Sequence, residues 1–176
     1  MTTTTTHPRQ PAEGDYAPYY GRYVAAAQTD DILELLIRQK TEAIDFFKAI
    51  VWEKWEQAYA PEKWTLAEVV LHLIDAERIF AYRALRIARG DQTPLAGFEQ
   101  DDYVPTSEAA TRTPASIVDE FAAVREATVQ LFKNFTDTMW ERRGTASELE
   151  VTVTALAFIM AGHTAHHLQV IRERYL

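Results

Sequence analysis

The sequence predicts an all-α protein, a four-helix bundle with one long crossover loop. Hydrophobic residues make up 47% of its 176 positions, whereas glycine (6) and proline (7) are scarce. Such a composition favours long helices over many strands joined by turns. Four stretches carry apolar residues at helical spacing, and one connection between them, residues 91–112, is long enough to cross the length of a bundle.

The chain divides into a tail and one domain. Residues 1–18 are rich in threonine, proline and glycine, and we expect them to form a disordered N-terminal tail. Residues 19–176 have the length of one ordinary domain, and we expect them to form the helical bundle. His7 lies in the tail, and we expect no role for it.

The first two helices have clear starting signals. The first is expected from about Asp30 to Ile50, with Thr29 or Asp30 as its N-cap. Thr65 and Glu68 have the spacing of a capping box, which opens a second helix that runs to about Arg89. Gly90 fits the stop that follows.

The third and fourth helices complete the bundle. Thr113 and Pro114 provide an N-cap and a proline in the first helical position, and this helix is expected to reach about Trp140. The last helix is expected from about Thr152 to Tyr175. Before the second helix, an aromatic stretch is expected to pack over the end of the core through Trp52, Trp55, Tyr59 and Trp64.

Composition excludes several functions. The net charge of −8 argues against a nucleic-acid partner, because phosphate binding needs a positive surface. The absence of cysteine excludes disulfides, a thiolate nucleophile and cysteine metal ligands. No secretory signal and no run of about 18–20 apolar residues is present, so we expect a cytoplasmic protein without a membrane partner.

Three of the five histidines lie within the segment GHTAHH near the end of the chain. His163 and His167 are one helical turn apart and share an apolar stripe that is expected to point into the bundle. The other members of the stripe are Leu156, Ile159, Met160, Val170 and Ile171. The i, i+4 spacing lets both imidazoles bind one divalent ion. The small residues Ala161, Gly162 and Ala165 would let another helix approach closely.

A third histidine is expected to join them. His72 belongs to a second inward stripe with Val69, Ile79 and Arg83. Three neutral histidines from two helices would leave coordination positions open, as a catalytic metal site requires. His166 could replace His167 in an i, i+3 pair, although a role behind the ligands or on the surface fits it better. The alternative is that each core histidine is hydrogen-bonded to a carboxylate or carbonyl group and binds no metal.

Other polar residues near these histidines have two interpretations. Asp75, Glu77 and Gln169 could accept hydrogen bonds from the ligands, but pairing with Arg78 or Arg172, or exposure on a solvated face, is favoured. In the crossover, three residues could overhang the site: Asp101, Asp102 and Tyr103.

The sequence resembles the DinB/YfiT-like superfamily of metal-binding four-helix bundles over residues 28–175. The resemblance is carried by WTLAEVVLHLIDAE around His72, RALRIARGD at the end of the second helix, and GHTAHHLQVIRERYL with His163 and His167. It implies a metal site at His72, His163 and His167 for nickel, zinc or iron, one long crossover, and a homodimer in many members. Gln169 stands where the iron enzymes of ergothioneine synthesis have glutamate, which argues against that activity.

The resemblance and the residues leave two functions open. The first is a metal-dependent enzyme, either a thiol S-transferase that uses a low-molecular-weight thiol or a hydrolase, acting on a small electrophilic substrate. The second is a non-catalytic, metal-stabilised or stress-associated binding bundle whose ion is structural. The same three histidines serve both chemistries, so the ligands do not choose between them, and no further catalytic residue is assigned.

Overall fold

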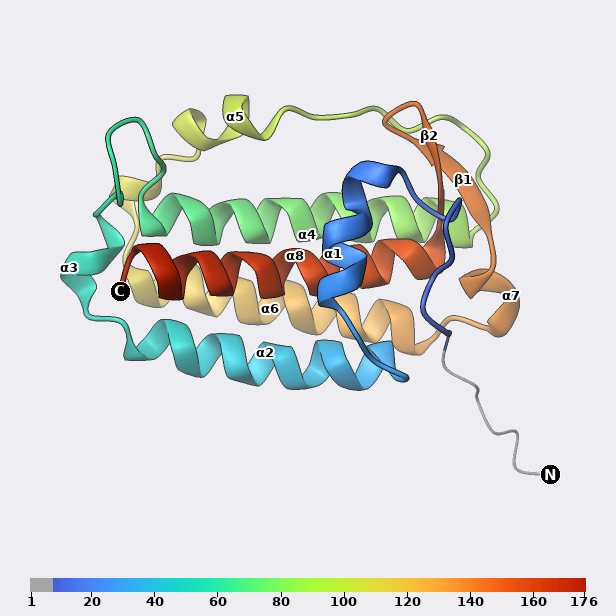
Figure 1. The fold of residues 1–176 in the computed structure, drawn as a ribbon, viewed down its shortest axis with the longest axis horizontal. Coiled ribbons are helices and arrows are strands. Elements are labelled where there is room, and N and C mark those ends of the chain that lie inside the picture. Colours follow the sequence, from blue (N-terminus) through green and yellow to red (C-terminus); the bar gives the residue numbers. More distant parts are fainter. Residues whose placement is uncertain (1–7) are drawn as a thin grey trace.

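Four long helices run side by side along the molecule in the computed structural model, which describes residues 8–176 (Figure 1). They are α2 (Ile32–Ala49), α4 (Leu66–Ala88), α6 (Pro114–Lys133) and α8 (Val153–Arg174). The predicted four-helix bundle is confirmed. His7 lies outside the described residues.

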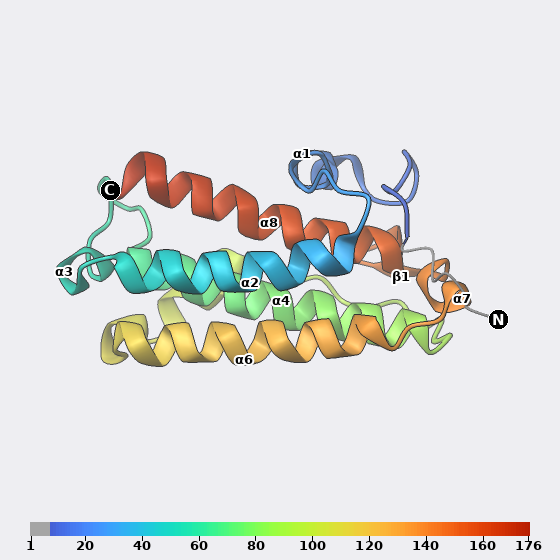
Figure 2. The same ribbon diagram turned by 90° about the horizontal axis from the view of Figure 1, so that it is seen from below.

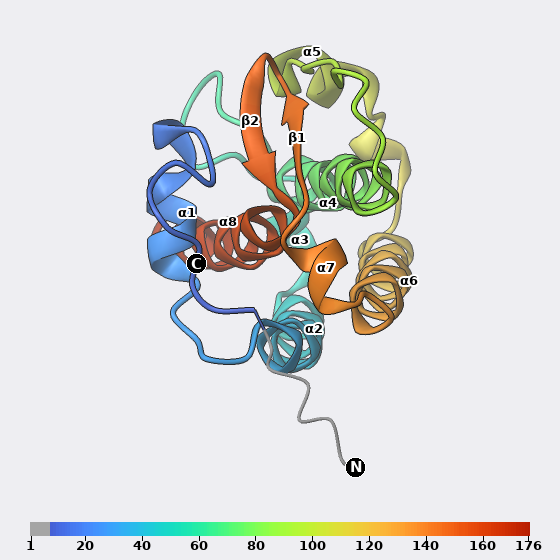
Figure 3. The same cartoon turned by 90° about the vertical axis from the view of Figure 1, so that its right-hand side faces the viewer.

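The bundle has one crossover, as predicted. Helices α4 and α6 run in one direction and α2 and α8 in the other, so the segment between α4 and α6 must return along the whole bundle (Figure 1). Seen end on, the helices follow one another around the bundle in the order α2, α6, α4 and α8 (Figure 3). Because of this order, α4 packs against α6 and α8, and His72 of α4 lies on a helix next to the one that carries His163 and His167.

Local signals fix most helix ends. The Thr65 side chain accepts a hydrogen bond from the Glu68 amide at 3.3 Å, and Glu68 accepts one from the Thr65 amide at 2.7 Å, so the predicted capping box is present. Gly90 has a φ of +82°, the left-handed conformation that favours glycine after a helix. The N-cap of α2 is Asp31, one residue beyond Asp30 and two beyond Thr29, the two predicted caps.

The third helix ends earlier than predicted, at Lys133 instead of about Trp140. Thr136 accepts a hydrogen bond from the Met139 amide and starts a separate short helix, α7 (Asp137–Trp140). The chain folds back at this point, so that the ring of Trp140 stacks on Phe132 with centroids 5.1 Å apart. A β-hairpin that the helical pattern did not predict follows, with β1 (Arg143–Ala146) antiparallel to β2 (Leu149–Thr152).

Several short helices lie in the connections between the long helices and before the first of them. The connection from α2 to α4 contains α3 (Trp52–Trp55), and the crossover contains α5 (Gln100–Tyr103) and the 3-10 helices η2 (Val104–Thr106) and η3 (Ala109–Thr111). Before α2 come the 3-10 helix η1 (Pro18–Tyr20) and α1 (Gly21–Ala26). Within residues 8–176, no helix is both long and apolar enough to cross a bilayer.

Part of the segment assigned to the tail packs on the domain. The Asp15 carboxylate pairs with Arg143 at 2.6 Å, and the Asp15 carbonyl accepts a hydrogen bond from the Thr152 amide at 3.0 Å. Gln10 donates a hydrogen bond to the carbonyl of Val24 at 2.9 Å. Residues in this range therefore hold α1 and the hairpin next to one another.

Helix α1 packs closely against α8 because Gly162 of α8 has no side chain at the point of contact. It lies on the outer side of α8, away from α6 (Figure 2). A β-carbon built on Gly162 would lie 1.7 Å from the carbonyl oxygen of Tyr23, a distance that no side chain could occupy. The small residue therefore permits the close approach that the sequence predicted.

The core consists of two apolar clusters with a polar layer between them. One cluster includes Phe80, Phe132 and Phe158, and the other includes Phe47 and Phe121. At the boundary lie one polar residue from each long helix, all buried: Gln39, Glu77, Arg125 and Thr164.

The Arg125 side chain joins this layer together. It is fully buried and donates three hydrogen bonds of 2.8–3.0 Å to the carboxylate of Glu77. It also donates to the side-chain oxygens of Gln39 and Thr164, each at 2.9 Å. Since the four residues come from α2, α4, α6 and α8, the guanidinium contacts each of the other three helices at the centre of the bundle.

Candidate metal centre

Helices α4 and α8 bring the three predicted histidines together. Nε2 of His72 lies 3.0 Å from Nε2 of His163. The ring centroid of His167 lies 4.6 Å from that of His163 and 5.0 Å from that of His72. One ring nitrogen from each of the three residues falls within 4.8 Å of the other two.

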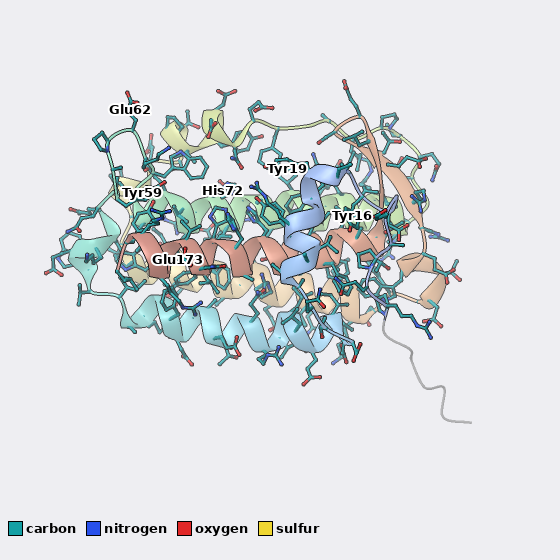
Figure 4. The ribbon with its side chains drawn as sticks, in the orientation of Figure 1. Tyr16, Tyr19, Tyr59, Glu62, His72 and Glu173 are labelled. Atoms are coloured by element: carbon teal, nitrogen blue, oxygen red, sulfur yellow. The ribbon has the colours of Figure 1, made fainter. Side chains whose placement is uncertain are left out.

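The triad lies in the seam between α4 and α8 instead of on the bundle axis. Figure 4 shows His72 pointing from α4 toward α8, and Arg125 occupies the centre of the bundle. His163 and Thr164 are adjacent, so their side chains diverge by about 100° and only Thr164 reaches that centre. His163 is buried, as predicted, and both histidines of the stripe lie beside His72 of the neighbouring helix α4.

Aromatic rings surround the histidines. The ring of Tyr23, from α1, meets His163 edge on with centroids 5.1 Å apart, and the ring of Trp64 lies 5.0 Å from His72. His72 and His163 are only 5% and 6% exposed, whereas His167 is half-buried. Helix α1 and the loop before α4 therefore shield two imidazoles and leave the third at the edge.

Burial keeps the imidazoles neutral. It lowers the pKa of His72 to about 4 and the pKa of His167 to about 3. The pKa of His163 also falls well below its usual range, first because of burial and then because His167 and His72 lie beside it. Three neutral imidazoles at ordinary pH are the form in which histidine binds a metal.

A cavity of about 590 Å³ opens beside the triad. Its wall includes His167, His166, Trp64 and Asp101, and it extends to Tyr59 in the loop before α4 (Figure 4). The carboxylate of Asp101, on α5, also acts on His72, because its charge partly offsets the fall in the pKa of that histidine. A small molecule could therefore approach the triad from the side of His167.

The donor set fits a divalent metal ion. Two nitrogen ligands at about 2.1 Å from one ion lie roughly 3.0–3.4 Å apart, and the nitrogens of His72 and His163 are separated by 3.0 Å. Nδ1 of His167 is buried and has no hydrogen-bond partner within residues 8–176, so it is a buried polar atom that a cation or its ligands could satisfy. Nitrogen donors of this type suit nickel, zinc and iron.

Comparison with known proteins identifies the family. A family model described as the DinB superfamily matches residues 35–171. The chain belongs to the DinB superfamily. The resemblance inferred from the sequence is therefore confirmed.

Two solved structures share the DinB fold of this chain. One is YfiT from Bacillus subtilis, described as a probable metal-dependent hydrolase with an unusual four-helix bundle topology. It matches this chain with a TM-score of 0.69 and 16% sequence identity, and the match covers 96% of this chain and 94% of YfiT. The other is a mycothiol-dependent maleylpyruvate isomerase, with a TM-score of 0.65, 9% identity, and coverage of 78% of this chain and 58% of the isomerase. No curated protein matches the chain.

The remaining predicted residues of this DinB domain have other partners. Glu77 pairs with the buried Arg125 instead of with Arg78 or Arg172. Asp75 lies 3.8 Å from Arg78, as expected, and Gln169 donates a hydrogen bond to Glu173. Within residues 8–176, the side chains of Asp75, Glu77 and Gln169 make no hydrogen bond to a histidine of the triad.

His166 lies beside the triad without belonging to it. It is half-buried, its ring centroid is 5.1 Å from that of His167, and it lines the cavity. This position agrees with a role behind the ligands or at the entrance.

The crossover contributes one residue to the cavity wall instead of three. Asp101 lines the cavity, whereas Tyr103 packs against Phe98 at a centroid distance of 5.4 Å and lines a different pocket. In the aromatic stretch, Trp55 is buried as predicted, but Trp52 is 56% exposed.

The metal-free protein should lose stability as the pH falls. The unfolded histidines titrate near 6.5 and the folded ones well below, so between pH 6.5 and about 4 the unfolded chain binds more protons. Each of His72 and His167 should lower the free energy of unfolding by on the order of 1–2 kcal/mol between pH 7 and 5. Urea titrations in the presence of a chelator measure this effect.

A single substitution measures the contribution of His72 to the pH dependence of the free energy of unfolding. His72→Gln should reduce the pH slope by about one proton in the same range. Equal slopes for wild type and His72→Gln would contradict the neutral, buried state of His72.

Proposed function

We propose that this DinB-superfamily chain is a metal-dependent hydrolase that holds a divalent ion on His72, His163 and His167 and acts on a small electrophilic substrate. The observation that carries the proposal is the convergence of three neutral imidazoles from two helices beside a cavity of about 590 Å³. A purely structural ion would not need such a cavity, so this arrangement favours a catalytic site over the non-catalytic bundle.

Each part of the chain has a distinct task in this proposal. An ion bound by three neutral ligands keeps its full positive charge and supplies Lewis acidity. The rings of Tyr23 and Trp64 exclude water from the buried side, which strengthens electrostatic interactions there. Asp101 places a carboxylate at the cavity, where it can accept a proton from an attacking water molecule.

Hydrolysis is favoured over thiol transfer by the comparison structures. The match to YfiT, a probable metal-dependent hydrolase, spans nearly the whole of both chains. The match to the mycothiol-dependent isomerase supports transfer to or from a low-molecular-weight thiol as the second candidate, and the thiol would have to be external because the chain has no cysteine.

Metal content tests the ligand assignment. Protein purified without a histidine tag and dialysed against nickel or zinc should contain about one ion per chain by elemental analysis, and the ion recovered without added metal identifies the native one. His163→Ala should lose the ion and His167→Ala should lose at least most of it, because two ligands bind far more weakly than three.

The neighbouring histidine provides the matched control. His166→Ala removes an imidazole from the same helix outside the triad and should keep stoichiometric metal. Retention of the ion in both His163→Ala and His167→Ala, or a wild-type protein that stays free of metal, would refute the assignment.

Activity distinguishes the candidate functions. Metal-loaded protein should hydrolyse activated esters or amides, and Asp101→Asn should lower the rate while leaving the metal content unchanged. Turnover that requires added thiol would favour the transferase, and a loaded protein inactive with every electrophile would favour the non-catalytic bundle. The homodimer and the cytoplasmic location stay predictions, which size-exclusion chromatography and localisation of the native protein can test.

A further inference from the structure

A second feature of the fold is a buried arginine without a counter-ion. The side chain of Arg83, on α4, is only 2% exposed, and no carboxylate within residues 8–176 forms an ion pair with it. Burying a charge without a partner of opposite sign is unfavourable, since the group gives up its hydration. The other buried arginine, Arg125, satisfies this requirement through Glu77.

Arg83 uses only part of its hydrogen-bonding capacity. Its Nη2 donates to the carbonyl of Ala96 at 2.8 Å and to the hydroxyl of Ser147 at 2.9 Å, and thereby ties the crossover and the hairpin to α4. Its Nε and Nη1 donate no hydrogen bond to any residue within 8–176. Three N–H groups of a positively charged side chain are therefore free to bind an acceptor.

Arg83 lines a pocket of about 360 Å³ between α4 and the crossover. Its walls combine apolar side chains, Ile79 and Leu95, with the rings of Phe98 and Tyr103. The ring of Phe98 lies 5.9 Å from the guanidinium carbon of Arg83. The pocket thus places the guanidinium of Arg83 within mostly apolar surroundings.

The charges around the pocket favour a carboxylate over a phosphate. The second arginine in the wall, Arg86, already pairs with Asp91 and contacts the hydroxyl of Tyr82. One unpaired guanidinium matches the single charge of a carboxylate, whereas a doubly charged phosphate would lie near the Asp91 carboxylate with only one free cation.

We propose that this pocket binds a small organic carboxylate, whose charged group is held by Arg83 and whose apolar body packs on Ile79, Leu95 and Phe98. Arg83 is eleven residues beyond His72 on the same helix, about 16 Å along its axis. The pocket is therefore separate from the histidine triad, and the proposal does not depend on the metal-dependent activity.

Titration of the full chain with benzoate tests the proposal. Benzoate should bind with one-to-one stoichiometry, and benzamide, which has nearly the same shape without the charge, should bind at least tenfold more weakly. Arg83→Met should weaken benzoate binding at least tenfold. His163→Ala should retain it within about twofold, because the histidines lie elsewhere.

A second variant separates binding from the structural task of Arg83. Ser147→Ala removes one of the hydrogen bonds that tie the hairpin to α4 but keeps the guanidinium, and it should bind benzoate within about threefold of wild type. If Arg83→Met fails to fold, a crystal of the wild-type protein soaked with 4-bromobenzoate should place the bromine in this pocket.

Several results would overturn the proposal. They are benzoate affinity equal in wild type and Arg83→Met, loss of benzoate binding in His163→Ala, and bromine located beside the triad. Inorganic phosphate that binds more tightly than benzoate and is lost in Arg83→Met would also overturn it, in favour of a phosphate site.

Discussion

Replacing Arg125 with methionine should lower the free energy of unfolding by about 3–5 kcal/mol. The substitution leaves the carboxylate of Glu77, which is 4% exposed, without its cation in the middle of the bundle. It also removes the donors to Gln39 and Thr164. The loss combines an unpaired buried charge with two buried oxygens, Oε1 of Gln39 and Oγ1 of Thr164, that no longer accept a hydrogen bond from Arg125.

A double-mutant cycle measures the interaction energy between Glu77 and Arg125. Glu77→Met combined with Arg125→Met should recover a substantial part of the loss, because two buried charges are then replaced by apolar side chains of similar length. Urea denaturation of the four proteins gives the coupling energy. A loss below about 1 kcal/mol in Arg125→Met, or a double variant less stable than both single variants, would contradict this account.

Replacing Gly162 with alanine should displace α1 from α8. The added methyl group would lie 1.7 Å from the carbonyl oxygen and 2.4 Å from the carbonyl carbon of Tyr23, so backbone must move. Such overpacking costs typically about 1–3 kcal/mol, and the top of this range is expected because no flexible side chain can yield. The shift would also remove the Tyr23 ring from His163.

Two measurements follow the displacement. Urea denaturation gives the stability loss, and trypsin cleavage after Arg22, within α1, should become several times faster in Gly162→Ala than in wild type. Gly21→Ala is the matched control, because it adds a methyl group to α1 with the nearest atom 3.9 Å away and should be neutral or slightly stabilising. Equal cleavage rates in wild type and Gly162→Ala would contradict the tight contact.

Features that depend on neighbouring residues could be predicted from the sequence. The capping box of Thr65 and Glu68 needs only three residues of spacing, and the turn after α4 needs a glycine at position 90. The pairing of His163 with His167 follows from one helical turn. Each of these signals depends only on residues close together in the sequence, so it predicts the same local structure whatever the rest of the fold is.

Long-range contacts could not be predicted in this way. Arg125 lies in a helix with charged residues on several sides, and nothing near it indicates that its partners are 48 and 86 positions away. His72 was expected to face inward, but the seam in which it meets His163 depends on the order of helices around the bundle. The break at Lys133 was missed because the apolar pattern continues through Phe135 and Trp140, which pack on the helix by folding back.

The contact between α1 and α8 constrains the order in which the protein can assemble. Tyr23 precedes nearly all of the bundle in the sequence, while its partner Gly162 lies in the final long helix. During synthesis, α1 cannot pack against α8 until α8 has left the ribosome. Enclosure of His163 by the Tyr23 ring is consequently a late event in the assembly of the protein.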